Sequence, residues 1–272
     1  MDFFQALILG ILQGITEFLP ISSSGHLVLG EAVLGLDVEA LKSFDVAVHM
    51  GTLVAIIIYF WKDLVGLIMG FLSLIRVVKP NKKHDEYHML ILFIVIGSVP
   101  AVLVGFLLGD AIDYWFRNTL YVGLFMIIIA ELFIVAEGKL KKFKKPTELK
   151  LGHAIIIGCF QALALIPGVS RSGSTIAAGI FQGISREKAA RFSFLMAMPV
   201  IFGAGMLTVV KELRGGELTI ELMPMVVGFI ASAAAGFASV YFLMKFLKNH
   251  TLKVFSVYLF IVGAISVIIS IL

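Results

Sequence analysis

The chain has 272 residues, of which 60% are hydrophobic and only 15% are charged, whereas about 25% charged residues are typical of soluble proteins. With a mean hydropathy of +1.03, this composition indicates a membrane protein and excludes a disordered chain, while the single cysteine excludes a disulfide scaffold. The net charge of +4 is typical of basic cytoplasmic loops, so we expect the lipid bilayer and no nucleic acid as a partner.

Two stretches of the chain are apolar at both ends and polar in the middle. They cover residues 3–35 and 151–184, and the polar segments are P-I-S-S-S-G-H (20–26) and P-G-V-S-R-S-G-S-T (167–175). We predict that each forms a re-entrant hairpin of two broken helices rather than one continuous helix. Six other stretches reach the roughly 20 apolar residues that a membrane-spanning helix needs. They are residues 44–75, 89–108, 120–135, 192–210, 222–247 and 254–272.

The two interrupted stretches match each other at an offset of 148 residues. The matching pairs are Gly10 and Gly158, Gln13 and Gln161, Ser22 and Ser170, Ser24 and Ser172, Gly25 and Gly173, Gly35 and Gly183, and Phe44 and Phe192. A shared S-x-S-G that follows a glutamine nine residues earlier indicates an internal duplication. We therefore predict a first repeat at 1–137, a basic cytoplasmic linker at 138–150 and a second repeat at 151–272.

The distribution of basic residues predicts how the repeats cross the membrane. Of the 22 lysines and arginines, 16 lie in four loops, at 76–88, 138–150, 185–191 and 245–253. These loops should be cytoplasmic. If each hairpin enters and leaves on one face, each repeat has three crossings, and an odd number inverts the second half relative to the first. The predicted fold is an all-α polytopic membrane protein with an inverted-topology repeat, whose functional loops lie near the bilayer midplane.

The first polar segment combines hydroxyls, an imidazole and a carboxylate. Its polar residues are Gln13, Glu17, Ser22, Ser23, Ser24 and His26. Gln13 and Glu17 are four residues apart and share one helical face. In one interpretation the serines cap the following helix and His26 bonds a carbonyl. An ionisable Glu17 within a membrane-embedded segment favours a functional cavity instead.

The second polar segment is cationic where the first is acidic. Arg171 is flanked by the hydroxyls of Ser170, Ser172 and Thr175 at a glycine-rich helix start. A guanidinium, free backbone amides and a positive helix end are what a phosphate or diphosphate requires. Alternatively, Arg171 neutralises Glu17 across the two repeats, and a resting ion pair of that kind could still yield to an anionic ligand.

These residues resemble the two signature motifs of the undecaprenyl-diphosphate phosphatases, the bacitracin-resistance family. The matching segments are Q-G-I-T-E-F-L-P-I-S-S-S-G-H (13–26) and P-G-V-S-R-S-G-S-T (167–175), supported by F-D-V-A-V-H-M-G-T-L (44–53) and F-S-F-L-M-A-M-P (192–199). The resemblance covers nearly the whole chain. The first motif of the family has Glu or Gln and then Glu four residues later, and Gln13 with Glu17 matches the glutamine variant.

The resemblance implies hydrolysis of a C55 polyprenyl diphosphate to the monophosphate carrier lipid and phosphate, which supports cell-wall synthesis and bacitracin resistance. Ser23 would be the nucleophile, His26 the general acid or base, Glu17 an activating carboxylate and Arg171 the main diphosphate ligand. The other diphosphate-binding residues would be Gln13, Ser22, Ser24, Gly25, Ser170, Ser172, Gly173 and Thr175. We favour a serine phosphoenzyme over a water activated by His26 or Glu17.

The resemblance also bears on cofactor, location and assembly. A divalent cation, Mg²⁺ or Ca²⁺, would have Glu17 and Gln13 as ligands, although an amide in place of a carboxylate makes tight binding less secure. The expected location is the cytoplasmic or inner membrane, with several crossings and an active site open to the outer face. A homodimer is left open.

Three further interpretations complete the sequence-based expectations. A polyprenyl-phosphate flippase would use the same anion site, because inverted repeats around a midplane site are also the architecture of transporters. His49 is expected to be a structural histidine, with a role in lining the site as the second interpretation. Glu131 is expected to face the helix bundle as a hydrogen-bond partner.

Overall fold

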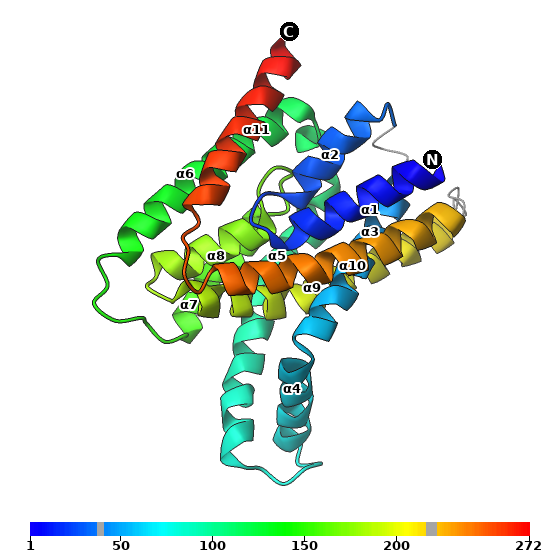
Figure 1. Ribbon diagram of the computed structural model, residues 1–272. Helices are drawn as coiled ribbons and strands as arrows, with labels where there is room; N and C mark the ends of the chain where they lie inside the picture. The colour runs from blue at the N-terminus through cyan, green and yellow to red at the C-terminus, as the bar shows by residue number, and fades with distance from the viewer. Residues whose placement is uncertain (37–40, 216–221) are drawn as a thin grey trace.

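The computed structural model describes residues 1–36, 41–215 and 222–272. Within these residues the fold is entirely helical, as predicted (Figure 1). The helices are α1 (Phe3–Phe18), α2 (Ser23–Val33), α3 (Lys42–Tyr59), α4 (Trp61–Leu74), α5 (Lys82–Phe116), α6 (Thr119–Leu140), α7 (Leu151–Leu163), α8 (Arg171–Phe181), α9 (Arg186–Gly215), α10 (Leu222–Phe246) and α11 (Lys253–Ile271).

Five of the described helices, α5, α6, α9, α10 and α11, are long and apolar enough to cross a membrane. The predicted span at 44–75 is not one straight helix, because α3 and α4 are bent by 81° at Phe60. Phe60 is buried in the core, while α4 turns away to pack against α5, and the two extend from the rest of the molecule (Figure 1). Counting this bent pair as one span gives six crossings, the predicted number.

The two interrupted stretches each contain a pair of short helices. Helices α1 and α2 have 16 and 11 residues, and α7 and α8 have 13 and 11. At a rise of about 1.5 Å per residue, none of the four spans the roughly 30 Å hydrocarbon core alone. The division into halves at 1–137 and 151–272, and their inversion, stays a prediction.

The second helix of each pair begins with the same cap. The Ser22 hydroxyl accepts a hydrogen bond from the Gly25 N–H at 3.3 Å, and the Ser170 hydroxyl accepts one from the Gly173 N–H at 3.0 Å. Each serine thereby satisfies one of the amides that lack a partner in the first turn of a helix. The capping role that the sequence offered for the serines of the first loop is therefore present at Ser22, and Ser170 makes the same contact in the second loop.

Both capped helix starts pack against α6. A methyl group added at Gly25 would lie 2.5 Å from the Met126 side chain, and one added at Gly173 would lie 2.7 Å from the Phe133 ring. Met126 and Phe133 are fully buried and lie on the same face of α6, seven residues apart. Helix α6 thus holds the starts of α2 and α8 beside each other, and the two glycines allow that close approach.

The buried face of α6 also corrects one expectation. Glu131 is exposed and does not face the bundle, because it follows Ala130 on the buried face by one residue, a rotation of about 100°. Glu137 occupies that face instead and is fully buried. Its carboxylate accepts hydrogen bonds from the Arg186 guanidinium and, at 2.9 Å, from the Leu252 N–H. This contact joins α6 to the starts of α9 and α11.

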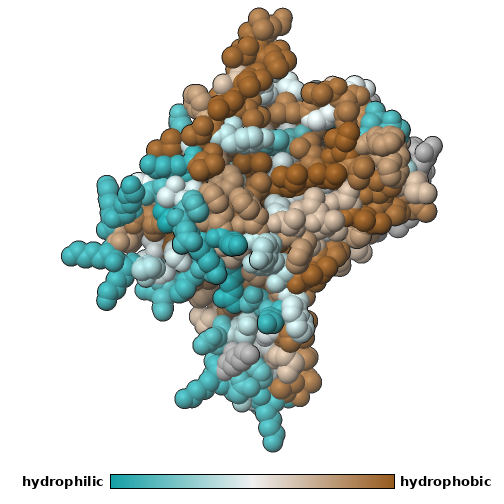
Figure 2. Space-filling model, viewed as in Figure 1, coloured by the Kyte–Doolittle hydropathy of each residue, from teal (hydrophilic) through white to brown (hydrophobic). Residues whose placement is uncertain are grey.

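The surface separates apolar and polar regions in the way a membrane protein requires. Figure 2 shows hydrophobic residues over the upper helices and hydrophilic residues over the α6–α7 connection and the far end of α4 and α5. Those hydrophilic regions contain the lysines and arginines of the 76–88 and 138–150 loops. The molecule is a multi-pass membrane protein with a wide apolar surface for lipid.

Candidate active site

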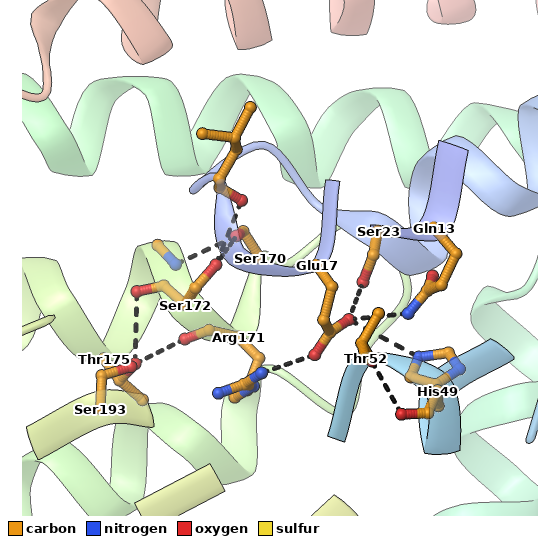
Figure 3. Close-up of polar contacts among 12 residues, drawn as sticks. Gln13, Glu17, Ser23, His49, Thr52, Ser170, Arg171, Ser172, Thr175 and Ser193 are labelled. Carbon is orange, nitrogen blue, oxygen red and sulfur yellow. Dashed lines mark hydrogen bonds and ion pairs between the residues drawn. The ribbon is translucent and has the colours of Figure 1, made fainter. Parts of the chain in front are cut away.

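The two polar loops meet at the carboxylate of Glu17 (Figure 3). Glu17 lies in the last turn of α1, and Arg171 is the first residue of α8. The Arg171 Nη2 atom donates to Glu17 Oε1 at 2.5 Å. The Ser172 hydroxyl also donates to the Leu19 carbonyl at 3.2 Å. These two contacts join segments separated by about 150 residues into one site.

The second oxygen of Glu17 receives the polar groups of the first loop. The Ser23 hydroxyl donates to Glu17 Oε2 at 2.5 Å, and the Gln13 side-chain amide donates to the same atom at 3.0 Å. The side chain of Glu17 is only 5% exposed. A buried carboxylate is tolerated when it is paired and fully hydrogen-bonded, and Arg171, Ser23 and Gln13 together provide those partners.

His49, which sequence reasoning treated mainly as structural, lies at this site. Its Nε2 atom is 3.7 Å from Glu17 Oε2, and its Nδ1 atom is 2.6 Å from the Asp45 carbonyl oxygen. Figure 3 shows the His49 ring on the side of Glu17 opposite to Arg171. The lining role that sequence reasoning ranked second thus matches its position. Its presence in the 44–53 segment shared with the resembling family was the available signal.

His26 makes other contacts than the one its predicted role requires. Its Nδ1 atom is 2.8 Å from the Ser22 carbonyl oxygen, and its Nε2 atom is 2.8 Å from the Tyr258 hydroxyl in α11, against which its ring stacks. A carbonyl oxygen only accepts, so Nδ1 carries a proton, and in the neutral ring Nε2 accepts from Tyr258. Among the described residues, the side-chain acceptor of the Ser23 hydroxyl is therefore Glu17 and not His26.

The remaining predicted residues of the second loop form a connected group of hydroxyls. The Ser170 and Ser172 hydroxyls are 3.3 Å apart, and the Thr175 hydroxyl donates to the Arg171 carbonyl at 2.7 Å. Thr175 also contacts the Ser193 hydroxyl of α9 at 2.7 Å. In this conformation these groups fix the backbone around Arg171. Ser24, on the first turn of α2, is half-buried.

Two polar atoms at the site, Arg171 Nη1 and Gln13 Oε1, are buried and have no hydrogen-bond partner within residues 1–36, 41–215 and 222–272. Buried polar groups are nearly always paired, so an unpaired guanidinium nitrogen indicates a place for an acceptor. A guanidinium presents its donors in a planar fork that fits two phosphate oxygens. Arg171 can therefore receive an anion beside its contact with Glu17.

The donor set does not fit a metal ion held by protein groups alone. Over residues 1–36, 41–215 and 222–272, no group of three or more His, Cys, Asp or Glu side chains is placed to hold one. The oxygens of Glu17 face Arg171 on one side and Ser23 with Gln13 on the other, and Gln13 turns a donor toward the carboxylate. The expectation that Glu17 and Gln13 bind Mg²⁺ or Ca²⁺ finds no such centre here and stays a prediction.

Comparison with known proteins identifies the relatives of this chain. It is 41% identical to the undecaprenyl-diphosphatase of Methanosphaera stadtmanae, covering 100% of this chain and 99% of that protein. The undecaprenyl-diphosphatase of Rubrobacter xylanophilus is 39% identical, with 97% of each chain covered. That of Trichlorobacter lovleyi is 42% identical, covering 93% of this chain and 91% of the relative. The family model for the bacitracin resistance protein BacA matches residues 6–265. The chain therefore belongs to the BacA family of bacitracin resistance proteins.

Proposed function

We propose that this protein is an integral membrane phosphatase that hydrolyses undecaprenyl diphosphate to undecaprenyl phosphate and inorganic phosphate. Membership of the BacA family and relatives named undecaprenyl-diphosphatase support this activity. The reaction returns the carrier lipid to cell-wall synthesis and confers resistance to bacitracin. The substrate partner is the polyprenyl diphosphate, whose apolar tail would lie along the lipid-facing helices.

The observation that carries the proposal is the position of Glu17 between Ser23 and Arg171. One carboxylate oxygen accepts the Ser23 hydroxyl at 2.5 Å, and the other accepts the Arg171 guanidinium at 2.5 Å. A serine is a weak nucleophile until a neighbouring base takes its proton. Glu17 contacts the Ser23 hydroxyl and can take its proton. Arg171 lies on the other side of Glu17, where it can bind the phosphate that Ser23 attacks. Phosphoryl transfer depends mainly on such positioning and positive charge.

In the serine route, Ser23 Oγ attacks the terminal phosphorus. The new bond joins Oγ to that phosphorus, the bond to the bridging oxygen breaks, and undecaprenyl phosphate leaves. The hydroxyl proton passes to Glu17 Oε2. A water molecule then attacks the phosphoserine, the bond between phosphorus and Oγ breaks, and Glu17 returns the proton to Oγ. Both hydrogens of the water leave with the inorganic phosphate.

In the alternative route, Glu17 or His26 activates a water that attacks the phosphorus directly. The hydrogen bond from Ser23 to Glu17 supports the serine route, because it places the proton to be lost on the base. A role of His26 as base for Ser23 would require its ring to leave Tyr258. His26 therefore supports the start of α2 in the conformation described, through the Ser22 carbonyl.

The remaining expectations are parts of the same proposal. A cytoplasmic or inner membrane location, with the site open to the outer face, is supported by the 16 basic residues in the loops predicted to be cytoplasmic. The steps above use no divalent cation, and an assay with Mg²⁺, Ca²⁺ or a chelator tests that requirement. Mass measurement of the purified protein in detergent tests a homodimer.

Phosphate release by the purified protein in detergent micelles, with undecaprenyl diphosphate as substrate, tests the function. No compartments exist in micelles, so turnover requires chemistry and not transport. We expect release of one phosphate per lipid, with undecaprenyl phosphate as the other product. If folded protein bound the lipid and released no phosphate with Mg²⁺, Ca²⁺ or neither, the result would favour the flippase instead.

A further inference from the structure

A histidine borders Glu17 on the side opposite to Arg171. The His49 Nε2 atom lies 3.7 Å from Glu17 Oε2, the oxygen that accepts Ser23. The His49 side chain is 32% exposed, whereas that of Glu17 is 5% exposed. The imidazole therefore borders the buried carboxylate and is itself partly exposed.

The anchoring of the ring determines what His49 can offer. The Asp45 carbonyl oxygen, 2.6 Å from Nδ1, can only accept, so Nδ1 carries a proton. The ring then attracts a carboxylate at Nε2 only when that atom is also protonated, which makes it an imidazolium cation. The geometry thus gives His49 one fixed donor at Nδ1 and places Nε2 3.7 Å from Glu17 Oε2, where a protonated ring would attract the carboxylate.

The backbone that carries His49 is held by further contacts. The Thr52 hydroxyl donates to the His49 carbonyl at 2.7 Å, and Arg117 donates to the Asp45 carboxylate at 2.6 Å. Arg117 lies between α5 and α6, so this ion pair fixes α3 against another part of the bundle. The ring of His49 is consequently directed by the fold and not by its contact with Glu17 alone.

The reaction gives such a group a function. A diphosphate that binds at Arg171 Nη1 shares the positive charge that the guanidinium otherwise gives to Glu17 alone. A buried carboxylate whose charged partner is shared is less stable, and it more readily turns or takes up a proton. Either change would remove the acceptor of the Ser23 proton. Gln13 stays in contact with Oε2, but its amide is neutral.

We propose that His49 is a positioning residue, which keeps the Glu17 carboxylate directed at Ser23 when the diphosphate engages Arg171. This inference rests on the proposed phosphatase activity. It predicts that His49 acts on turnover through Glu17 and contributes little to substrate affinity.

The test compares three variants of the full-length protein in the phosphate-release assay. H49L removes both donors, H49A removes the ring without adding volume, and H49Q keeps an amide N–H that can face Oε2. We expect kcat to fall about 10- to 100-fold in H49L and H49A, because Glu17 then lacks the nearby charge that holds it while the diphosphate engages Arg171. KM should stay within about 2-fold. H49Q should recover only part of kcat, because its amide can donate to Oε2 but carries no charge.

The matched control is H250A, since His250 is exposed beyond the end of α10 and stacks on Phe246. Its kcat should equal that of the parent protein. Thermal unfolding in detergent identifies any variant that fails to fold, and H49A and H49Q then carry the comparison without H49L.

Unchanged kcat in H49A would overturn the proposal. Equal losses in H49L and H49Q would overturn it too, because these two side chains are similar in size and only glutamine offers a donor. A large rise in KM would reassign His49 to substrate binding. Absence of phosphate release by the parent protein would instead refute the phosphatase activity itself, so the two failures are separable.

Discussion

The two polar loops match in sequence and in the cap of the helix that follows, but they differ at the first residue of that helix. At the offset of 148 residues, Ser23 corresponds to Arg171. Each is the first residue of its helix, directly after a capping serine. One presents a hydroxyl and the other a guanidinium, and the two reach opposite oxygens of Glu17. Equivalent positions in two related loops therefore supply a nucleophile candidate and its anion-binding partner.

The helices before the two loops differ as well. Glu17 lies in the first helix of its pair, and the corresponding residue in the second stretch is Leu165. In the part of the chain that the structure describes, Glu17 is consequently the one carboxylate in contact with both loops, and it lies between two different donors. Under the proposed function, proton transfer belongs to the first loop and charge binding to the second, and variants of each loop should affect different kinetic constants.

The largest effect is expected for E17Q, which keeps the shape of the side chain and removes the base shared by both loops. We predict a fall in kcat of about 10²- to 10⁴-fold, the range typical of positioned proton transfer. The measurement is phosphate release in detergent, with thermal unfolding to verify folding and S270A, near the end of α11, as a control. A kcat within 10-fold of the parent protein would remove Glu17 from the proton transfer.

Substitution of Arg171 should have the next largest effect and should act on binding as well as turnover. For R171A we predict a fall in kcat/KM of about 10²- to 10³-fold, comparable to the loss of one donor to a developing charge. R171K should recover only part of it, because an ammonium lacks the planar fork. Initial rates of phosphate release over a range of substrate concentrations give kcat and KM for each variant. An unchanged KM in R171A would contradict the division between the loops.

The smallest effects are expected at the matching glycines, where the two loops pack on α6. An added methyl group meets the end of the flexible Met126 side chain at Gly25, but the rigid, buried Phe133 ring at Gly173. G173A should therefore reduce the free energy of unfolding by about 1–3 kcal/mol, the usual cost of overpacking, and G25A by less. Denaturation in detergent measures both, and the reverse order would show that the two contacts are not comparable.

Local sequence patterns predicted much of the architecture. The apolar stretches gave an all-helical membrane protein with six crossings if the bent pair counts as one. The polar interruptions marked both helix starts, and the capping offered for the first-loop serines is present at Ser22 because it depends on residues three apart. Ser170 caps α8 in the same way. The ion pair between Glu17 and Arg171, one of two sequence-based interpretations of Arg171, is also present. An isolated charge inside a membrane is costly, so residues of opposite charge pair there.

Features that depend on distant segments could not be predicted from spacing. Ser23 and His26 are three residues apart, which suggested a catalytic pair, but Tyr258 lies 232 residues from His26 and binds its ring. The bend at Phe60 depends on the packing of α4 against α5, and His49 reaches Glu17 only through the placement of α3 beside α1. Such contacts depend on how distant helices pack, and the spacing of residues along one sequence does not predict that packing.

Covalent labelling of Ser23 tests the central claim most directly. Undecaprenyl diphosphate labelled with ³²P in its terminal phosphate would be mixed with the protein in detergent and quenched with acid within one turnover. We predict labelled protein in the parent chain, with the phosphate on Ser23, and neither label nor turnover in S23A. Turnover by S23A at a rate near that of the parent protein would contradict the serine route and assign the attack to a water activated at Glu17.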